Sequence, residues 1–162
     1  TVFKGESPEG EVWVSVELAR HRSGEGFVPL LVAVRNSAGD PVTLERSSFE
    51  LVGADGSVAP LAKLASIREE YRKASFDRTV LQGNGFPIGT RLQAFRAVPA
   101  EFFPVLGFRS GVLNDSVGLP NLYWTADLLY FPVAVGLAEG REVVLKVQPD
   151  GWEAPVRVRF YV

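Results

Sequence analysis

The residue types that most often carry out catalysis are sparse in this chain. His21 is the only histidine among 162 residues, so a Ser-His-Asp triad would have to be built around it. It lies beside Arg22 and Ser23 in a stretch with two glycines, and no Gly-x-Ser-x-Gly turn, which presents a nucleophilic serine, occurs in the sequence. We therefore predict that His21 is a solvated loop residue without a catalytic role.

The acidic residues fit turns better than metal or sugar sites. The chain has no cysteine, so a zinc site would have to combine one histidine with carboxylates. The aspartates do not form an EF-hand loop, and most stand beside Gly, Pro or Asn, where aspartate favours turns. Calcium held between separated loops stays open, as does an acid pair made from Glu69-Glu70 and Glu101. We predict no metal, no cofactor and no enzymatic activity.

Phosphate and nucleic-acid sites lack the residues that they need. The segment QGNGFPIG (residues 82–89) has no Lys-Ser/Thr pair after it and precedes a strand-like run, so we interpret it as a plain loop. Seventeen basic and nineteen acidic side chains give a net charge of -2, which does not provide the cationic field of a polyanion binder. Arginine outnumbers lysine thirteen to four, a bias that we attribute to genome composition or a heat-tolerant source. We expect no nucleic-acid binding.

Aromatic side chains give the strongest indication of a functional surface. Several of them crowd into residues 102–131, where bulky neighbours occur in pairs. Only one of two adjacent strand residues can face a core, so the other needs cover from a loop, a helix or another molecule. We predict an apolar patch here in which at least two rings are markedly exposed. Its candidate residues are Phe102, Phe103, Tyr123, Trp124, Tyr130 and Phe131.

The elements that must position these residues are mostly strands. Apolar and polar residues alternate over residues 12–20, 142–148 and 154–162, which is typical of half-buried strands. Residues 27–35 are apolar on both faces, as in a central strand, although Pro29 restricts pairing there to an edge or a bulge.

Short strands separated by turns favour antiparallel pairing. The turn at residues 36–40 is followed by strand patterns at 41–45 and 48–53, and a second turn follows at residues 55–56. The pattern of residues 90–98 also predicts a strand.

One helix interrupts this series. An apolar stripe at spacings of three and four predicts a helix over 61–75, whose Leu64 and Tyr71 face packs over an open end or side of a sandwich. Residues 77–90 are interpreted as a loop. Residues 99–137 have no clean period, and within them residues 121–131 favour a strand, with a helix as the alternative.

Length and hydropathy indicate one domain, residues 1–162, without a membrane span. The sequence contains no stretch of eighteen apolar residues. It contains no methionine either, so we expect that a segment upstream of Thr1 was removed and that the protein is extracytoplasmic, in the periplasm or at the cell surface, with its signal or anchor lost.

Residues 32–56 carry a resemblance to a known family. Asn36, Gly39 and Pro41-Val42, followed by Phe49-x-Leu51 and Asp55-Gly56, resemble the immunoglobulin-like module of bacterial envelope lipoproteins and related secreted proteins. The resemblance covers about 25 residues; the predicted helix at 61–75 and the segment after Pro99 depart from the family pattern. It implies a structural or interaction role and supplies no catalytic residues.

These observations predict a mainly β fold: an antiparallel immunoglobulin-like β-sandwich of about seven to nine strands with one inserted helix. We expect a non-catalytic module for protein–protein interaction or envelope assembly, whose partner is another protein or a second copy of the chain. A carbohydrate-binding sandwich is the alternative, with Asn121, Tyr123 and Trp124 as its candidate sugar site.

Overall fold

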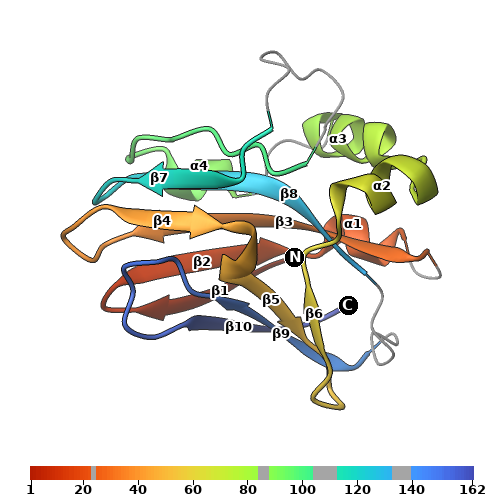
Figure 1. Ribbon diagram of the computed structural model, residues 1–162, viewed down its shortest axis with the longest axis horizontal. Helices are drawn as coiled ribbons and strands as arrows, with labels where there is room; N and C mark the ends of the chain where they lie inside the picture. The colour runs from red at the N-terminus through yellow and green to blue at the C-terminus, as the bar shows by residue number, and fades with distance from the viewer. Residues whose placement is uncertain (23–24, 84–87, 104–112, 133–139) are drawn as a thin grey trace.

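Antiparallel strands make up most of the molecule. The structure, a computed structural model, describes residues 1–22, 25–83, 88–103, 113–132 and 140–162 (Figure 1). Ten strands lie within these residues: β1 (Val2–Ser7), β2 (Gly10–Ser15), β3 (Phe27–Asn36), β4 (Val42–Glu45), β5 (Phe49–Val52), β6 (Val58–Pro60), β7 (Ser116–Leu119), β8 (Trp124–Pro132), β9 (Glu142–Val147) and β10 (Val156–Tyr161). The predicted mainly β, antiparallel class is therefore confirmed.

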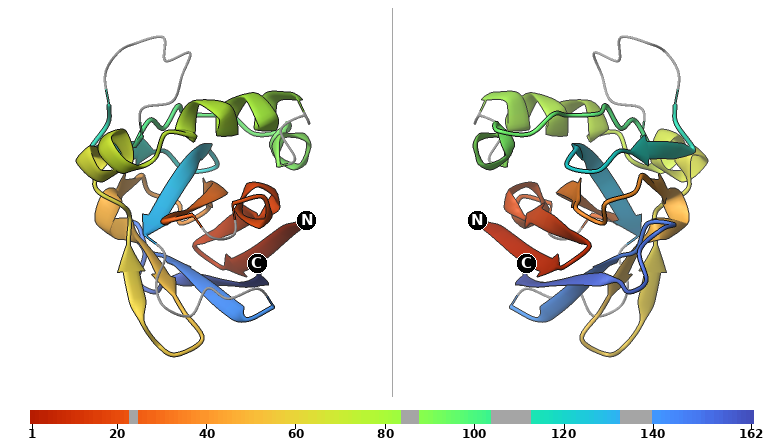
Figure 2. Two further views of the ribbon diagram at one scale, coloured as in Figure 1. Left: turned by 90° about the vertical axis from the view of Figure 1, so that its right-hand side faces the viewer. Right: turned by 90° about the vertical axis from the view of Figure 1, so that its left-hand side faces the viewer.

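The strands form two four-stranded sheets and a ribbon. The first sheet has the order β1-β2-β3-β8, the second sheet has the order β10-β9-β5-β6, and β4 pairs with β7. The two sheets pack face to face in a sandwich-like arrangement (Figures 1 and 2). Their inner faces supply one cluster of buried apolar side chains. The immunoglobulin-like type stays a prediction.

The sheets also approach each other at both sides of the sandwich. At one side β1 crosses β10 so closely that a Cβ atom on Gly5 would lie 2.5 Å from the carbonyl oxygen of Arg157. At the other side the N–H of Ala62, just after β6, donates to the carbonyl of Tyr130 in β8 at 2.8 Å. Glycine at position 5 is therefore required by the close approach of two backbones.

Helices cover the outer face of the first sheet. Four helices lie in the described residues: α1 (Glu17–Arg20), α2 (Leu64–Glu70), α3 (Ala74–Gly83) and α4 (Gly89–Leu92), with a 3₁₀ turn, η1 (Arg46–Ser48), between β4 and β5. Figures 1 and 2 show α2, α3 and α4 on the side of β3 and β8 that faces away from the second sheet. Tyr71, the residue after α2, packs its ring 5.3 Å from that of Tyr130, and Leu64 is partly buried against the core; the expected packing of Leu64 and Tyr71 against the sandwich is confirmed, although Tyr71 lies outside the helix.

Several strand predictions are confirmed. The patterns at 27–35, 41–45, 48–53, 142–148 and 154–162 become β3, β4, β5, β9 and β10. The two predicted turns contain Gly39 and Gly56, both with positive φ (92° and 81°). Pro29 lies where β3 pairs with β8 alone, because pairing with β2 begins at Leu31. That placement agrees with the expected restriction of Pro29 to an edge.

The prediction of a single helix over 61–75 was wrong in two respects. The helical stretch stops at Glu70, and Tyr71 has the extended φ and ψ of -116° and 94°. A second helix, α3, then occupies residues that were interpreted as a loop. The tertiary contacts of Asp77, described below, favour this helix, and sequence periodicity does not report such contacts.

Two strand predictions were also wrong. The strand predicted over 12–20 ends at Ser15, and the short helix α1 follows it because Leu18 and Ala19 are buried against the neighbouring elements. Residues 90–98 contain the end of α4 and one isolated bridge, from Ala97 to Trp124. Alternation over so few residues fits a helical turn that buries Leu92 equally well.

Residues 99–137 contain two strands in their described part, β7 and β8. The preference for a strand over 121–131 is confirmed. Ten strands exceed the expected seven to nine. Parts of this segment, residues 104–112 and 133–137, lie outside the described residues.

Candidate interaction face and polar pocket

The aromatic residues predicted as a surface patch lie inside the fold. Phe102, Phe103, Tyr130 and Phe131 are at most 1% exposed. Tyr123 and Trp124 are partly buried, and neither ring is markedly exposed. The expectation that at least two of the six rings are exposed was therefore wrong.

The burial of adjacent rings follows from the layers on both sides of β8. Tyr130 faces the helices, where its ring lies 5.3 Å from those of Tyr71 and Phe103. Phe131 points to the opposite face of the strand, where side chains of the two sheets meet. Phe102 packs edge-on against Phe49 of β5, with ring centroids 5.8 Å apart. The chain itself thus supplies the cover that adjacent bulky residues require.

The candidate sugar site is also occupied by internal contacts. The side-chain oxygen of Asn121 accepts the N–H of Gly39 at 3.1 Å, and the indole N–H of Trp124 donates to the carbonyl of Phe95 at 3.1 Å. The Tyr123 hydroxyl accepts a 3.4 Å hydrogen bond from an arginine. Each of the three side chains that would recognise a sugar therefore already makes one internal hydrogen bond.

The catalytic candidates do not form a constellation. His21 is exposed at the end of α1, as predicted for a loop residue. Within the described ranges, no group of three His, Asp or Glu side chains is arranged to hold a metal ion. In the same ranges no helix has the length and apolar character needed to span a bilayer.

A buried carboxylate joins the helices to the first sheet. Asp77 of α3 has no exposed surface and accepts from Nε and Nη2 of Arg22 at 2.9 and 2.8 Å. Its other oxygen accepts the hydroxyls of Tyr71 and Tyr130 at 2.7 and 3.1 Å. Burial raises the pKa of both tyrosines, and the neighbouring carboxylate acts in the same direction. This network was not predicted, and its central carboxylate, Asp77, is fully buried while Arg22 at its edge is 15% exposed.

A second polar cluster fixes the segment before residue 104. The carboxylate of Asp127 accepts the backbone N–H groups of Phe102 and Leu128, both at 2.8 Å. Arg46 donates to the carbonyls of Phe102 and Ala62 at 2.6 and 2.7 Å. Burial raises the pKa of Asp127 to about 7, although the two N–H donors and Arg46 act to lower it. The Asp127 carboxylate and the Arg46 guanidinium bind backbone N–H and carbonyl groups that would otherwise need a partner in a neighbouring strand. We therefore assign Asp127 and Arg46 a structural role.

The outer face of the second sheet differs from that of the first sheet because no described helix or strand covers it (Figures 1 and 2). Period-two alternation directs one set of side chains outward from each of its strands. We call this set the outer face: Glu50, Val52, Val58, Pro60, Glu142, Val144, Lys146, Arg157, Arg159 and Tyr161.

The outer face has an apolar row bordered by charges. Val144, Val52 and Val58 are cross-strand neighbours, and Val58 and Tyr161 are 57% and 50% exposed. Lys146 pairs with Glu50 at 3.1 Å. Arg157 and Arg159 are exposed on β10, and we find no ion pair for either one in the part of the chain that the structure describes.

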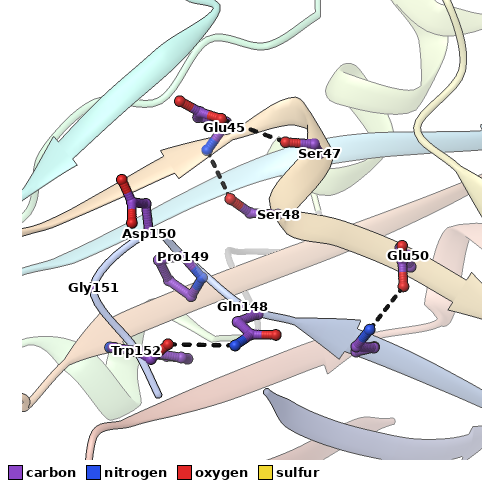
Figure 3. A pocket seen from close by; sticks show the side chains of 10 residues that line it. Glu45, Ser47, Ser48, Glu50, Gln148, Pro149, Asp150, Gly151 and Trp152 are labelled. Atoms are coloured by element: carbon purple, nitrogen blue, oxygen red, sulfur yellow. Dashed lines mark hydrogen bonds and ion pairs between the residues drawn. The ribbon is translucent and has the colours of Figure 1, made fainter. Parts of the chain in front are cut away.

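An open pocket lies at one end of this face, where β4, η1 and β5 meet the loop after β9 (Figure 3). Its volume is about 370 Å³. One side is formed by Glu45, Ser47, Ser48 and Glu50, and the other by Lys146, Gln148 and residues 149–152. The backbone of Asp150 pairs with that of Thr43 through two 2.9 Å hydrogen bonds, which hold the loop against β4.

The pocket is rich in hydrogen-bond acceptors. Three carboxylates (Glu45, Glu50 and Asp150) and the single ammonium of Lys146 give it a formal charge of -2. Several of its side-chain donors are used internally: Lys146 binds Glu50, the Gln148 amide N–H donates to the carbonyl of Trp152 at 3.3 Å, and the Ser47 hydroxyl donates to the Glu45 carboxylate at 3.4 Å. The pocket therefore presents mostly hydrogen-bond acceptors, the carboxylate and amide oxygens of its lining residues. These oxygens favour a ligand group that is cationic or rich in donors.

Comparisons with known proteins identify no relative. No family model, no curated protein and no solved structure matches the chain. The candidate site therefore depends on its own geometry. The sequence did contain a signal for the outer face: the alternation of residues 154–162 places Arg157, Arg159 and Tyr161 on one side.

Proposed function

We propose that the protein is a non-catalytic interaction module that binds another protein through the outer face of the second sheet. One observation carries this proposal. The first sheet has its outer face covered by α2, α3 and α4, whereas no helix or strand of the described residues covers the outer face of the second sheet (Figure 2).

The chemistry of the face agrees with a protein partner. Its centre is the row Val144, Val52 and Val58, with Tyr161 nearby, and its border is charged. Protein interfaces have this arrangement, with an apolar centre that is enriched in tyrosine and a polar rim. Within the row Val58 is 57% exposed and Val52 and Val144 are half-buried, so a partner that covers the row would remove apolar surface from water.

Site-specific cross-linking tests the proposal directly. A photoreactive amino acid placed at position 58 should form adducts with a protein partner in the native extract. The matched control is the same group at Phe76, which is 68% exposed on α3, on the opposite side of the molecule. Equal labelling at the two positions, or no adduct at position 58, would refute the proposal.

The non-catalytic part of the proposal is supported by the scattered catalytic residue types. Esterase, phosphatase and glycosidase substrates should give no turnover. Turnover that a single His21→Ala or Glu101→Gln substitution abolishes would contradict this assignment.

A finer form of the proposal places the module outside the cytoplasm, in envelope assembly. Its support is the resemblance of residues 32–56 to envelope lipoprotein modules. Cell fractionation of the native protein tests it, and a purely cytoplasmic signal would refute it. The carbohydrate alternative has weaker support, because the polar groups of its candidate residues are engaged internally. Retention on a polysaccharide column would revive it.

A further inference from the structure

The proposed function does not specify which protein is the partner. The charges on the outer face limit which kinds of surface can bind there. Resting on that function, we propose that the partner is a second copy of this chain. In this dimer the two outer faces lie against each other, and Arg159 of each copy enters the acidic pocket of the other.

Both signs of charge are present on one face, at separate places. Arg159 on β10 is exposed and forms no ion pair among the described residues, while the pocket at the end of β9 has a formal charge of -2. In a two-fold symmetric dimer the same patch of each copy meets its own image, so the patch must be self-complementary. A patch that has a cation at one place and an anionic pocket at another is self-complementary. In each dimer it forms two symmetric contacts between a cation and a pocket.

The chemical match is specific for a guanidinium group. The pocket presents carboxylate oxygens of Glu45 and Asp150 that have no cationic partner in the described residues. A guanidinium carries five N–H donors and no acceptor, and it pairs with carboxylates through charge-assisted hydrogen bonds. The Glu45 carboxylate accepts the Ser47 hydroxyl and the Ser48 backbone N–H, which are neutral donors, so an arginine supplies the positive charge that the two carboxylates lack.

The sheet geometry selects Arg159 over Arg157. Arg157 lies directly opposite Lys146 in the strand register, and Lys146 lines the pocket of the same copy. Arg159 lies opposite Val144, one outward position farther along the strand, which is about 7 Å away. A two-fold axis midway between Arg159 and the pocket passes over β9.

The size of the face predicts a weak dimer. β9 and β10 have six residues each, β5 has four and β6 has three, so at a strand spacing of about 4.8 Å the plane measures at most roughly 19 by 20 Å. This area is small beside the roughly 800 Å² per partner of stable complexes, so the association should be transient. Because charge pairs at its rim are screened, it should also weaken as salt is raised.

Sedimentation velocity over a range of concentrations tests the proposal on the full chain. Wild type should show a monomer–dimer equilibrium that shifts toward monomer in high salt. Arg159→Glu and Asp150→Lys should each weaken self-association by at least about tenfold, because each substitution places like charges in both symmetric contacts. Arg68→Glu and Glu69→Lys, on the exposed surface of α2, are the matched controls and should dimerise as wild type does.

Mixing the two charge variants gives the most specific result. In a mixed dimer the glutamate introduced at position 159 of one copy would face the lysine introduced in the pocket of the other, and the remaining contact would be native. The mixture should therefore recover dimers that neither variant forms alone. Both positions are exposed, and circular dichroism of each variant should match wild type.

The outcomes separate this inference from the proposed function. A monomeric wild type at all concentrations, or a mixture that stays monomeric, overturns the second copy as partner. If position 58 still cross-links a different protein, the interaction function survives that result. If position 58 forms no adduct with any protein, the proposed function and this inference both fail.

Discussion

The buried carboxylate of Asp77 should be one of the most sensitive positions in the protein. Among the described residues, Asp77→Ala removes the acceptor for the hydroxyls of Tyr71 and Tyr130 and the ion-pair partner of Arg22. These groups come from the loop after α1, the end of α2 and strand β8. The substitution therefore loosens the attachment of the helices to the first sheet.

The expected loss of stability in Asp77→Ala depends on the buried polar groups that lose their partner. Removing one partner of a buried ion pair costs about 3–5 kcal/mol, and each buried hydroxyl without a partner adds about 1–3 kcal/mol. The Arg22 side chain is 15% exposed, so it can turn toward water and recover part of its solvation. The contributions overlap, and we expect the free energy of unfolding to fall by about 3 kcal/mol.

Urea denaturation of Asp77→Ala, compared with Glu69→Ala on the exposed surface of α2, measures this loss. The control should change stability by less than about 0.5 kcal/mol. Tyr130→Phe should cost about 1 kcal/mol in wild type and almost nothing in the Asp77→Ala background, because its hydroxyl then has no carboxylate to bind. A loss below about 1 kcal/mol for Asp77→Ala, or additive effects of the two substitutions, would refute the network.

Three further substitutions have defined outcomes. Asn36→Ala should lower the free energy of unfolding by about 2–4 kcal/mol in urea melts, because the amide is fully buried and donates to the carbonyls of Asp40 and Leu119 at 2.8 and 3.0 Å; a loss under about 1 kcal/mol would contradict this. Gly5→Val should lower the melting temperature strongly, since its Cβ would lie 2.5 Å from a backbone oxygen of β10, and unchanged melting would show that the strands can separate there. Asp127, whose pKa is raised to about 7 when folded and is about 3.9 when unfolded, binds its proton more tightly in the folded state, so stability should fall as pH rises from about 4 to about 7 and then level off. Asp127→Asn should lack this slope in melts across the same range, and identical pH profiles for the two proteins would contradict the assignment.

Local patterns were sufficient to predict most of the second sheet. The alternation in residues 142–148 and 154–162 is a property of each strand alone, since one side faces the core and the other faces water. Prediction succeeded at β9 and β10 for that reason, and the burial of Val156, Val158 and Phe160 agrees with it. The β10 part of the outer face, Arg157, Arg159 and Tyr161, could therefore be anticipated, whereas β6 with its exposed Val58 was not predicted.

Prediction failed where a helix and a strand cover each other. The interpretation of Phe102, Phe103, Tyr130 and Phe131 as a surface patch assumed that one side of β8 lacked cover. That side is covered by α3, most of which was interpreted as part of a loop over residues 77–90 because the glycines and the proline of that segment are typical of turns. The burial of Asp77 is favoured by Arg22, 55 residues earlier in the chain. No window of a single sequence shows a contact at that separation.

The two sheets have different outer faces because their strands carry different outward side chains. Residues of β8 alternate between two apolar faces, with Leu129 and Phe131 on one side and Leu128 and Tyr130 on the other, so a second layer of chain had to cover it. On β10 the outward positions are Arg157, Arg159 and Tyr161, which water can solvate, and no described element covers them. The valine row beside them is the exception, because it is apolar and still lies on the solvent side. The chain therefore covers the apolar outer face of its first sheet with its own helices, whereas the described residues leave Val58 of the second sheet 57% exposed; that difference is the basis on which we propose a partner for the second sheet.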